Sequence, residues 1–108
     1  MIVTDQNVEA ALAFLADADA AGEAIYKMTK AENRSKQTFA RLYLSYSGPV
    51  EERKARALCN PEAMEMADQE AEASRDLERY KARRKEAEML IELYRTEAAN
   101  ARAAERIR

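Results

Sequence analysis

The fold is decided by an unbroken stretch that begins at Asn60-Pro61 and continues over residues 62–108 as EAMEMADQEAEASRDLERYKARRKEAEMLIELYRTEAANARAAERIR. Asparagine is a favoured helix N-cap, and proline suits the first helical position because its missing N–H would have no partner there. The residues that follow contain no glycine or proline and are rich in good helix formers. The sequence therefore predicts one helix over about residues 61–107, which would be about 70 Å long at ~1.5 Å per residue. Heptad spacing predicts an inward stripe along this helix, interrupted by charged members in its middle: Ala63, Met66, Glu70, Ala73, Leu77, Tyr80, Arg84, Ala87, Ile91, Tyr94, Ala98 and Ala101.

The region before this stretch predicts a second long helix, over about residues 5–46, that begins after Thr4 or Asp5. Its apolar residues recur in steps of three and four, as on a helix with one buried face. They are Val8, Ala11, Leu15, Ala18, Gly22 and Ile25 near the start, and Phe39, Tyr43 and Tyr46 near the end. The continuity of this helix stays open, because Gly22 costs about 1 kcal/mol relative to alanine and residues 29–38 are almost entirely polar.

A short connection separates the two long helices. Ser47-Gly48-Pro49 predicts a turn in which Gly48 is the cap and Pro49 takes the first position of a short helix over about residues 49–58. Cys59-Asn60-Pro61 then ends that helix. We expect Cys59, the only cysteine, to be a small buried residue of this corner.

Charge alternates in sign along the chain. Residues 1–30 hold five acids and two bases, residues 31–60 three and six, residues 61–80 seven and two, and residues 81–108 five and eight. If the two long helices fold back on each other, each acidic part meets a basic part, and Glu23 comes near Arg83, Arg84 and Lys85. The sequence therefore predicts an all-α fold, an elongated antiparallel helical hairpin that forms a single domain over residues 1–108.

Composition limits the class of protein. High charge with few aromatic residues also occurs in disordered chains, but the regular apolar spacing favours folded, coiled-coil-like helices. The chain lacks histidine and a Gly-rich phosphate loop, so we expect no enzyme and no cofactor. No apolar stretch approaches the ~20 residues of a membrane span, and a lone cysteine suits a reducing compartment. We expect a cytoplasmic protein without membrane contact.

The acids at the start of helix 61–107 allow two interpretations. Carboxylates can bind metal ions, but helical carboxylate sites combine Glu with a Glu-x-x-His motif, and histidine is absent. Acids in the first turns are also favoured by the helix dipole. We therefore interpret the acidic run as a solvated face rather than a metal site; its members are Glu62, Glu65, Asp68, Glu70 and Glu72.

Basic residues in the last quarter of the chain suggest contact with nucleic acid. Lys81, Arg83, Arg84 and Lys85 form a cluster, and Arg95, Arg102 and Arg106 share a helix face beyond it. Five acids are interleaved with these bases, and the net charge of the chain is −2, which predicts weak, salt-sensitive binding at most. We favour the interpretation that the bases face the acidic first quarter of the hairpin.

Three aromatic residues, Phe39, Tyr43 and Tyr46, form a stripe with Leu42 close to the turn. Opposite them the hairpin would place methionines, whose flexible side chains pack well against aromatic rings. The same stripe would serve as an interface anchor for a protein partner. We favour a packed corner and retain the three aromatic residues as candidate interaction residues.

Four short stretches of the chain form a further pattern: Tyr43-Leu44, Gly48-Pro49-Val50-Glu51-Glu52-Arg53-Lys54-Ala55-Arg56-Ala57, Arg83-Arg84-Lys85 and Tyr94-Arg95-Thr96-Glu97-Ala98-Ala99-Asn100. In this pattern the chain between about residues 39 and 102 resembles small helical proteins encoded by phages and prophages. It implies a non-enzymatic accessory role of the kind found among phage recombination and replication genes. Small phage inhibitors of host defence, such as anti-CRISPR proteins, are similar in size and character.

These observations predict a non-enzymatic protein–protein interaction module, either an accessory of a nucleic-acid complex or an inhibitor of a host machine. Because a thin hairpin buries little core for the backbone it orders, we expect a homodimer that forms a four-helix bundle. The alternative is a direct binder of single-stranded nucleic acid used in phage recombination or replication.

Overall fold

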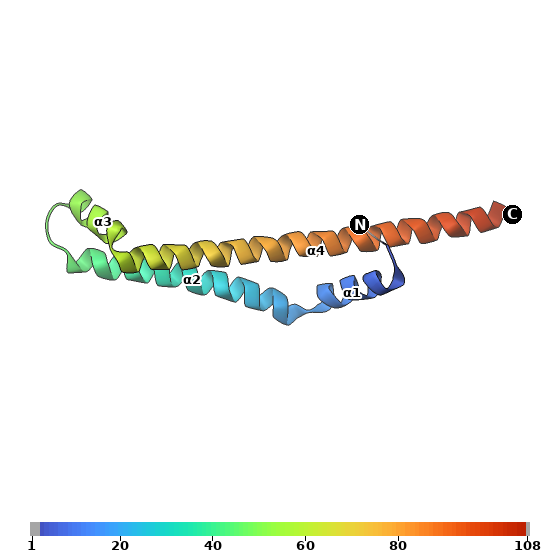
Figure 1. The fold of residues 1–108 in the computed structure, drawn as a ribbon, viewed down its shortest axis with the longest axis horizontal. Coiled ribbons are helices and arrows are strands. Elements are labelled where there is room, and N and C mark those ends of the chain that lie inside the picture. Colours follow the sequence, from blue (N-terminus) through green and yellow to red (C-terminus); the bar gives the residue numbers. More distant parts are fainter. Residues whose placement is uncertain (1–2, 108) are drawn as a thin grey trace. The chain divides into compact units, whose positions relative to one another are not determined.

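The computed structural model describes residues 3–107, and every regular element in this range is a helix (Figure 1). The elements are α1 (Asp5–Ala16), α2 (Ala18–Ser45), α3 (Val50–Cys59) and α4 (Pro61–Ile107). The predicted all-α class is confirmed. Met1, Ile2 and Arg108, at the ends of the predicted domain, lie outside the described residues.

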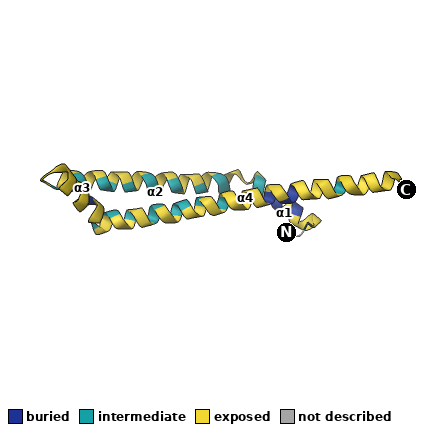
Figure 2. Cartoon of the chain, turned by 90° about the horizontal axis from the view of Figure 1, so that it is seen from above, coloured by how far each residue is buried: buried dark blue, intermediate teal, exposed yellow. Residues whose placement is uncertain are grey.

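Packing divides the chain into two compact units. The first combines α1 with the part of α4 that starts at Arg79, and the second is Gly22–Glu78, which holds most of α2, all of α3 and the start of α4. In the second unit α2 and α4 lie side by side and run in opposite directions, with α3 between them in the chain (Figures 1 and 2). The predicted antiparallel hairpin is confirmed there.

The long helix begins where the sequence predicts. α4 is continuous for 47 residues from Pro61. The Oδ1 atom of Asn60 accepts a hydrogen bond from the backbone N–H of Glu62 at 2.9 Å, as an N-cap side chain does. At the start of α1, Thr4 plays the same part, since its Oγ1 accepts from the backbone N–H of Asn7 at 3.1 Å.

The prediction of one helix over residues 5–46 is wrong at Asp17, which separates α1 from α2. The backbone of Asp17 leaves the helical region, with φ −79° and ψ 86°. Its side chain accepts from the N–H of Ala20 at 3.0 Å and so caps the start of α2. A short acid competes in this way for backbone donors and ends a helix without glycine or proline. Gly22, the expected weak point, lies inside α2.

The break changes which residues of α2 face inward. The predicted stripe fails after Asp17, because Ala18 and Gly22 are exposed and the side chain of Ile25 is 58% exposed. The half-buried and buried positions of α2 instead recur in steps of three and four from Ala24 to Leu42. The stripe consists of Ala24, Met28, Ala31, Ser35, Thr38 and Leu42, and the half-buried Glu32 and Phe39 lie beside it.

The matching stripe on α4 follows the sequence prediction. Ala63, Met66, Glu70, Ala73 and Leu77 are all half-buried. Most of these side chains, and of those on α2, are small or polar, so the second unit has a thin core. No large side chain is fully buried among the described residues.

The first unit has a more apolar core, drawn in dark blue in Figure 2. Ala11 of α1 packs with Ala87, Leu90 and Ile91 of α4, and Phe14 and Leu15 pack against this cluster. The predicted positions Ala87 and Ile91 are therefore core residues. Arg84, which the same spacing places in the stripe, is exposed.

α3 begins one residue later than predicted. Its N-cap is Pro49 rather than Gly48, and Pro49 makes no side-chain capping bond. Gly48 has φ +114°, a conformation that glycine adopts far more readily than other residues, and so reverses the chain after α2. At the end of α3, Cys59 is exposed, which corrects the expectation that it is buried.

Candidate interaction surfaces

The aromatic residues near the turn hold the corner of the second unit together. The rings of Phe39 and Tyr43 stack with their centres 6.2 Å apart. The guanidinium of Arg53, from α3, lies 4.4 Å from the centre of the Tyr43 ring and donates to its hydroxyl at 2.9 Å. This contact combines a cation–π attraction with a hydrogen bond. Through it, Tyr43 of α2 stabilises the position of α3.

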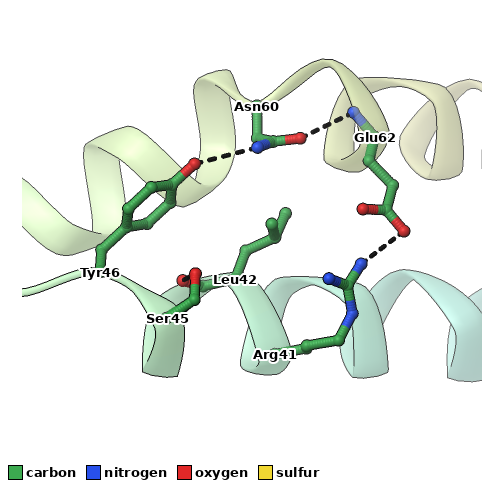
Figure 3. Close-up of polar contacts among 6 residues, drawn as sticks. All are labelled: Arg41, Leu42, Ser45, Tyr46, Asn60 and Glu62. Carbon is green, nitrogen blue, oxygen red and sulfur yellow. Dashed lines mark hydrogen bonds and ion pairs between the residues drawn. The ribbon is translucent and has the colours of Figure 1, made fainter.

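Tyr46 makes the second connection of this corner (Figure 3). Its hydroxyl accepts from Nδ2 of Asn60 at 2.9 Å, while Arg41 of α2 forms an ion pair with Glu62 of α4. Phe39, Tyr43 and Tyr46 are half-buried and Leu42 is buried. The structure therefore places the three candidate aromatic residues in the packing of the corner.

The basic cluster of α4 is divided among different contacts. The guanidinium of Arg83 lies 4.3 Å from the centre of the Phe14 ring in α1. Arg84 pairs with Glu88 along its own helix at 3.5 Å, and Glu23, its predicted counterpart, pairs with Lys27 at 3.8 Å. Lys85 is exposed, and Lys81 is also at the surface, where it has an interaction partner. The cluster is not a continuous free basic patch.

The last part of α4, residues 92–107, is the most exposed part of the first unit. Every described residue here is exposed except Ala98, which is half-buried. Arg95, Arg102 and Arg106 lie on this segment, at the surface. So do apolar side chains: Leu93 is 43% exposed and Tyr94 38%. We call residues 92–107 the C-terminal arm.

A shallow groove of about 290 Å³ runs between α1 and α4 in the first unit. Most of its lining side chains are apolar, including Ala11, Phe14 and Leu90, and Arg83 and Glu86 also line it. Because the groove is lined by one acid and one base, their charges oppose each other and the groove has no strong preference for a charged ligand.

An outward face of α2 was missed by the sequence analysis. Six exposed side chains surround a shallow hollow of about 320 Å³ on this helix: Tyr26, Thr29, Lys30, Asn33, Arg34 and Gln37. Their spacing follows one side of a helix. In the sequence most of this face belongs to the polar run 29–38, which leaves the continuity of the predicted helix open but does not by itself indicate a surface of its own.

Two other kinds of site are absent from the part of the chain that the structure describes. Between residues 3 and 107 no three side chains among His, Cys, Asp and Glu are grouped so that they could hold a metal ion. None of the helices in the same range has the length and apolar character needed to cross a membrane.

Comparisons with known proteins give no indication of function, so the proposals below rest on the geometry of the structure. No protein-family model, curated protein or solved structure matches the chain.

Proposed function

We propose that the protein is a non-enzymatic protein–protein interaction module whose C-terminal arm packs against another chain. The observation that carries this proposal is the exposure of Leu93 and Tyr94 on a segment that continues the α4 helix beyond the core cluster it shares with α1. A helix of this length without packing is marginal in water, even when its residues favour helix. A partner helix would supply the missing packing.

A second copy of the chain is the proposed partner. The thin core between α2 and α4 and the lack of any fully buried large side chain in the described residues support this choice. Small cores rarely give enough stability without oligomerisation, and two hairpins that pack side by side form a four-helix bundle. The resulting homodimer would present its outer faces to further proteins.

The biological setting of the proposal is a phage-type protein in the cytoplasm of a bacterial host. There it would act as an accessory of a nucleic-acid complex or as an inhibitor of a host machine, in the manner of an anti-CRISPR protein. The lone Cys59 supports a reducing compartment. The resemblance to small phage proteins over about residues 39–102 supports the setting.

Light scattering coupled to size-exclusion chromatography tests the assembly. We expect a mass of twice 12.2 kDa for the native chain and a shift toward the monomer for Leu93→Lys/Tyr94→Lys. The matched control is Leu58→Lys, which places a charge at an apolar side chain of α3 that is 62% exposed. A native chain that is monomeric at every concentration tested would contradict the proposal.

Direct binding of single-stranded nucleic acid is the second candidate function. The observation in its favour is the exposure of Lys85, Arg95 and Arg102 on one helix. Under this alternative, Lys85→Gln/Arg95→Gln should weaken the retention of an oligothymidine strand and reduce its salt dependence. Under the protein-interaction proposal the same variant should bind the strand as weakly as the native chain does.

A further inference from the structure

The outward face of α2 lies on the side of the helix opposite its inward stripe. Its members recur in steps of three and four from Tyr26 to Gln37 and are all exposed. The inward stripe, from Ala24 to Leu42, is half-buried or buried (Figure 2). At about 100° per residue the two sets point to opposite sides of α2. The outward face is thus turned away from α4 in the second unit.

This face is positively charged although the chain as a whole is slightly acidic. Its six residues include two bases, Lys30 and Arg34, and no acid, a net charge of +2. The nearest acid within α2 after Tyr26, Glu32, is half-buried and lies off the outward face. Glu23, one turn before Tyr26, pairs with Lys27. An anionic ligand would therefore meet Lys30 and Arg34 without an acid among the six residues of the face.

The uncharged members of the face narrow the choice of anionic ligand. Asn33 and Gln37 lie one turn apart, next to Arg34. Asn and Gln form paired hydrogen bonds with adenine in the major groove of DNA, and Arg does so with guanine. An α-helix is about 10–12 Å across with its side chains, and the major groove is about 12 Å wide.

We propose that the outward face of α2 binds duplex DNA with the helix in the major groove. Lys30 and Arg34 contact phosphates, while Asn33 and Gln37 reach base edges. A single strand fits less well, because stacking needs several aromatic side chains and this face has only Tyr26, over which Lys30 lies at 5.7 Å. The face is separate from the C-terminal arm, so this inference does not depend on the proposed interaction with a second chain.

Fluorescence anisotropy with a short mixed-sequence DNA duplex tests the charge contacts. We expect Lys30→Gln/Arg34→Gln to weaken binding about tenfold or more and to lower the slope of log affinity against log salt by about two. The matched control, Arg75→Gln/Arg79→Gln, removes the same charge from two exposed positions one turn apart on α4 and should bind as the native chain does. Equal losses in both variants, or no binding by the native chain at low salt, would overturn the proposal.

A duplex in which 7-deazapurines replace the purines tests whether the face contacts base edges in the major groove. This change removes the N7 acceptors of the major groove and leaves the phosphates and the minor groove intact. We expect it to weaken binding by the native chain and to have little further effect on Asn33→Ala/Gln37→Ala. Equal affinity of the native chain for both duplexes would overturn the major-groove contact. A poly-glutamate peptide that binds this face as tightly as the duplex would overturn DNA as its ligand in favour of an acidic protein.

Discussion

The side chain of Asn60 donates through Nδ2 to the hydroxyl of Tyr46 at 2.9 Å, which joins the residue before α4 to the residue after α2. Through Oδ1 the same side chain accepts from the N–H of Glu62, also at 2.9 Å (Figure 3). One residue therefore caps α4 and connects it to α2. The two roles can be separated, because Tyr46→Phe removes only the hydroxyl.

A double-mutant cycle measures the connection. Tyr46→Phe should lower the free energy of unfolding by about 0.5–1.5 kcal/mol, the usual net value of one hydrogen bond. Asn60→Ala should cost about 1 kcal/mol more, because it also removes the cap. Urea unfolding followed by circular dichroism, at one fixed chain concentration, should give a coupling energy equal to the effect of Tyr46→Phe. Strictly additive effects would show that the hydrogen bond contributes nothing.

For Tyr80 we expect substitution by phenylalanine to have the opposite effect on the free energy of unfolding. Its ring packs 5.4 Å from that of Phe14, and its hydroxyl is buried with no hydrogen-bond partner among residues 3–107. A buried polar group without a partner is unfavourable, so Tyr80→Phe should leave the free energy of unfolding unchanged or raise it by up to about 1 kcal/mol. The same urea experiment checks this. A loss as large as that of Tyr46→Phe would mean that the Tyr80 hydroxyl has a stabilising contact.

The sequence was sufficient to predict the elements with strong local signals. Asn60-Pro61 marks the start of α4 because both residues have a specific role at a helix N-terminus. The stripe of α4 up to Ile91 was also predictable except at Arg84, since its apolar members recur in regular steps of three and four there. Asp17 gave no comparable signal, because it lies among alanines and the apolar steps continue past it.

The missed break had a consequence for the candidate sites. Once α1 and α2 are treated as one helix, Ile25 belongs to the buried stripe, whereas its side chain is 58% exposed. The polar face that begins at Tyr26 then appears as a weak part of the seam rather than as a surface of its own. The contact between Arg83 and the Phe14 ring could not be predicted either. It depends on how α1 is rotated about its own axis, and this rotation is independent of α2 once the break at Asp17 is present.

The break itself can be tested by Asp17→Ala. This change removes the acceptor for the N–H of Ala20 and should cost about 1 kcal/mol of stability, although it raises the intrinsic helix propensity of the site. Asp19→Ala, in the first turn of α2, is the control and should cost only about 0.3–1 kcal/mol through the helix dipole. Thermal unfolding compares the two. A more stable Asp17→Ala with increased helical ellipticity would indicate that a continuous helix is the preferred state.

Hydrogen exchange along α4 tests whether the C-terminal arm depends on a partner. Amides near Ala87 and Ile91 lie in the core of the first unit, whereas every residue of the arm beyond them is exposed except the half-buried Ala98. Exposed helical segments open locally at little free-energy cost, and a short unpacked helix is marginal in water. At low concentration the arm should therefore exchange fast and the core slowly.

Raising the concentration should slow exchange in the arm if a second chain covers it, since a partner that binds only the ordered helix stabilises it by mass action. Exchange near Ala87 should change much less, because α1 already covers that part of α4. Leu93→Lys/Tyr94→Lys should remove the concentration dependence by placing two charges on the exposed apolar side chains of the arm. Leu58→Lys should retain it. Slow exchange of the arm at concentrations where light scattering gives the mass of one chain would mean that the helix is stable by itself and requires no partner.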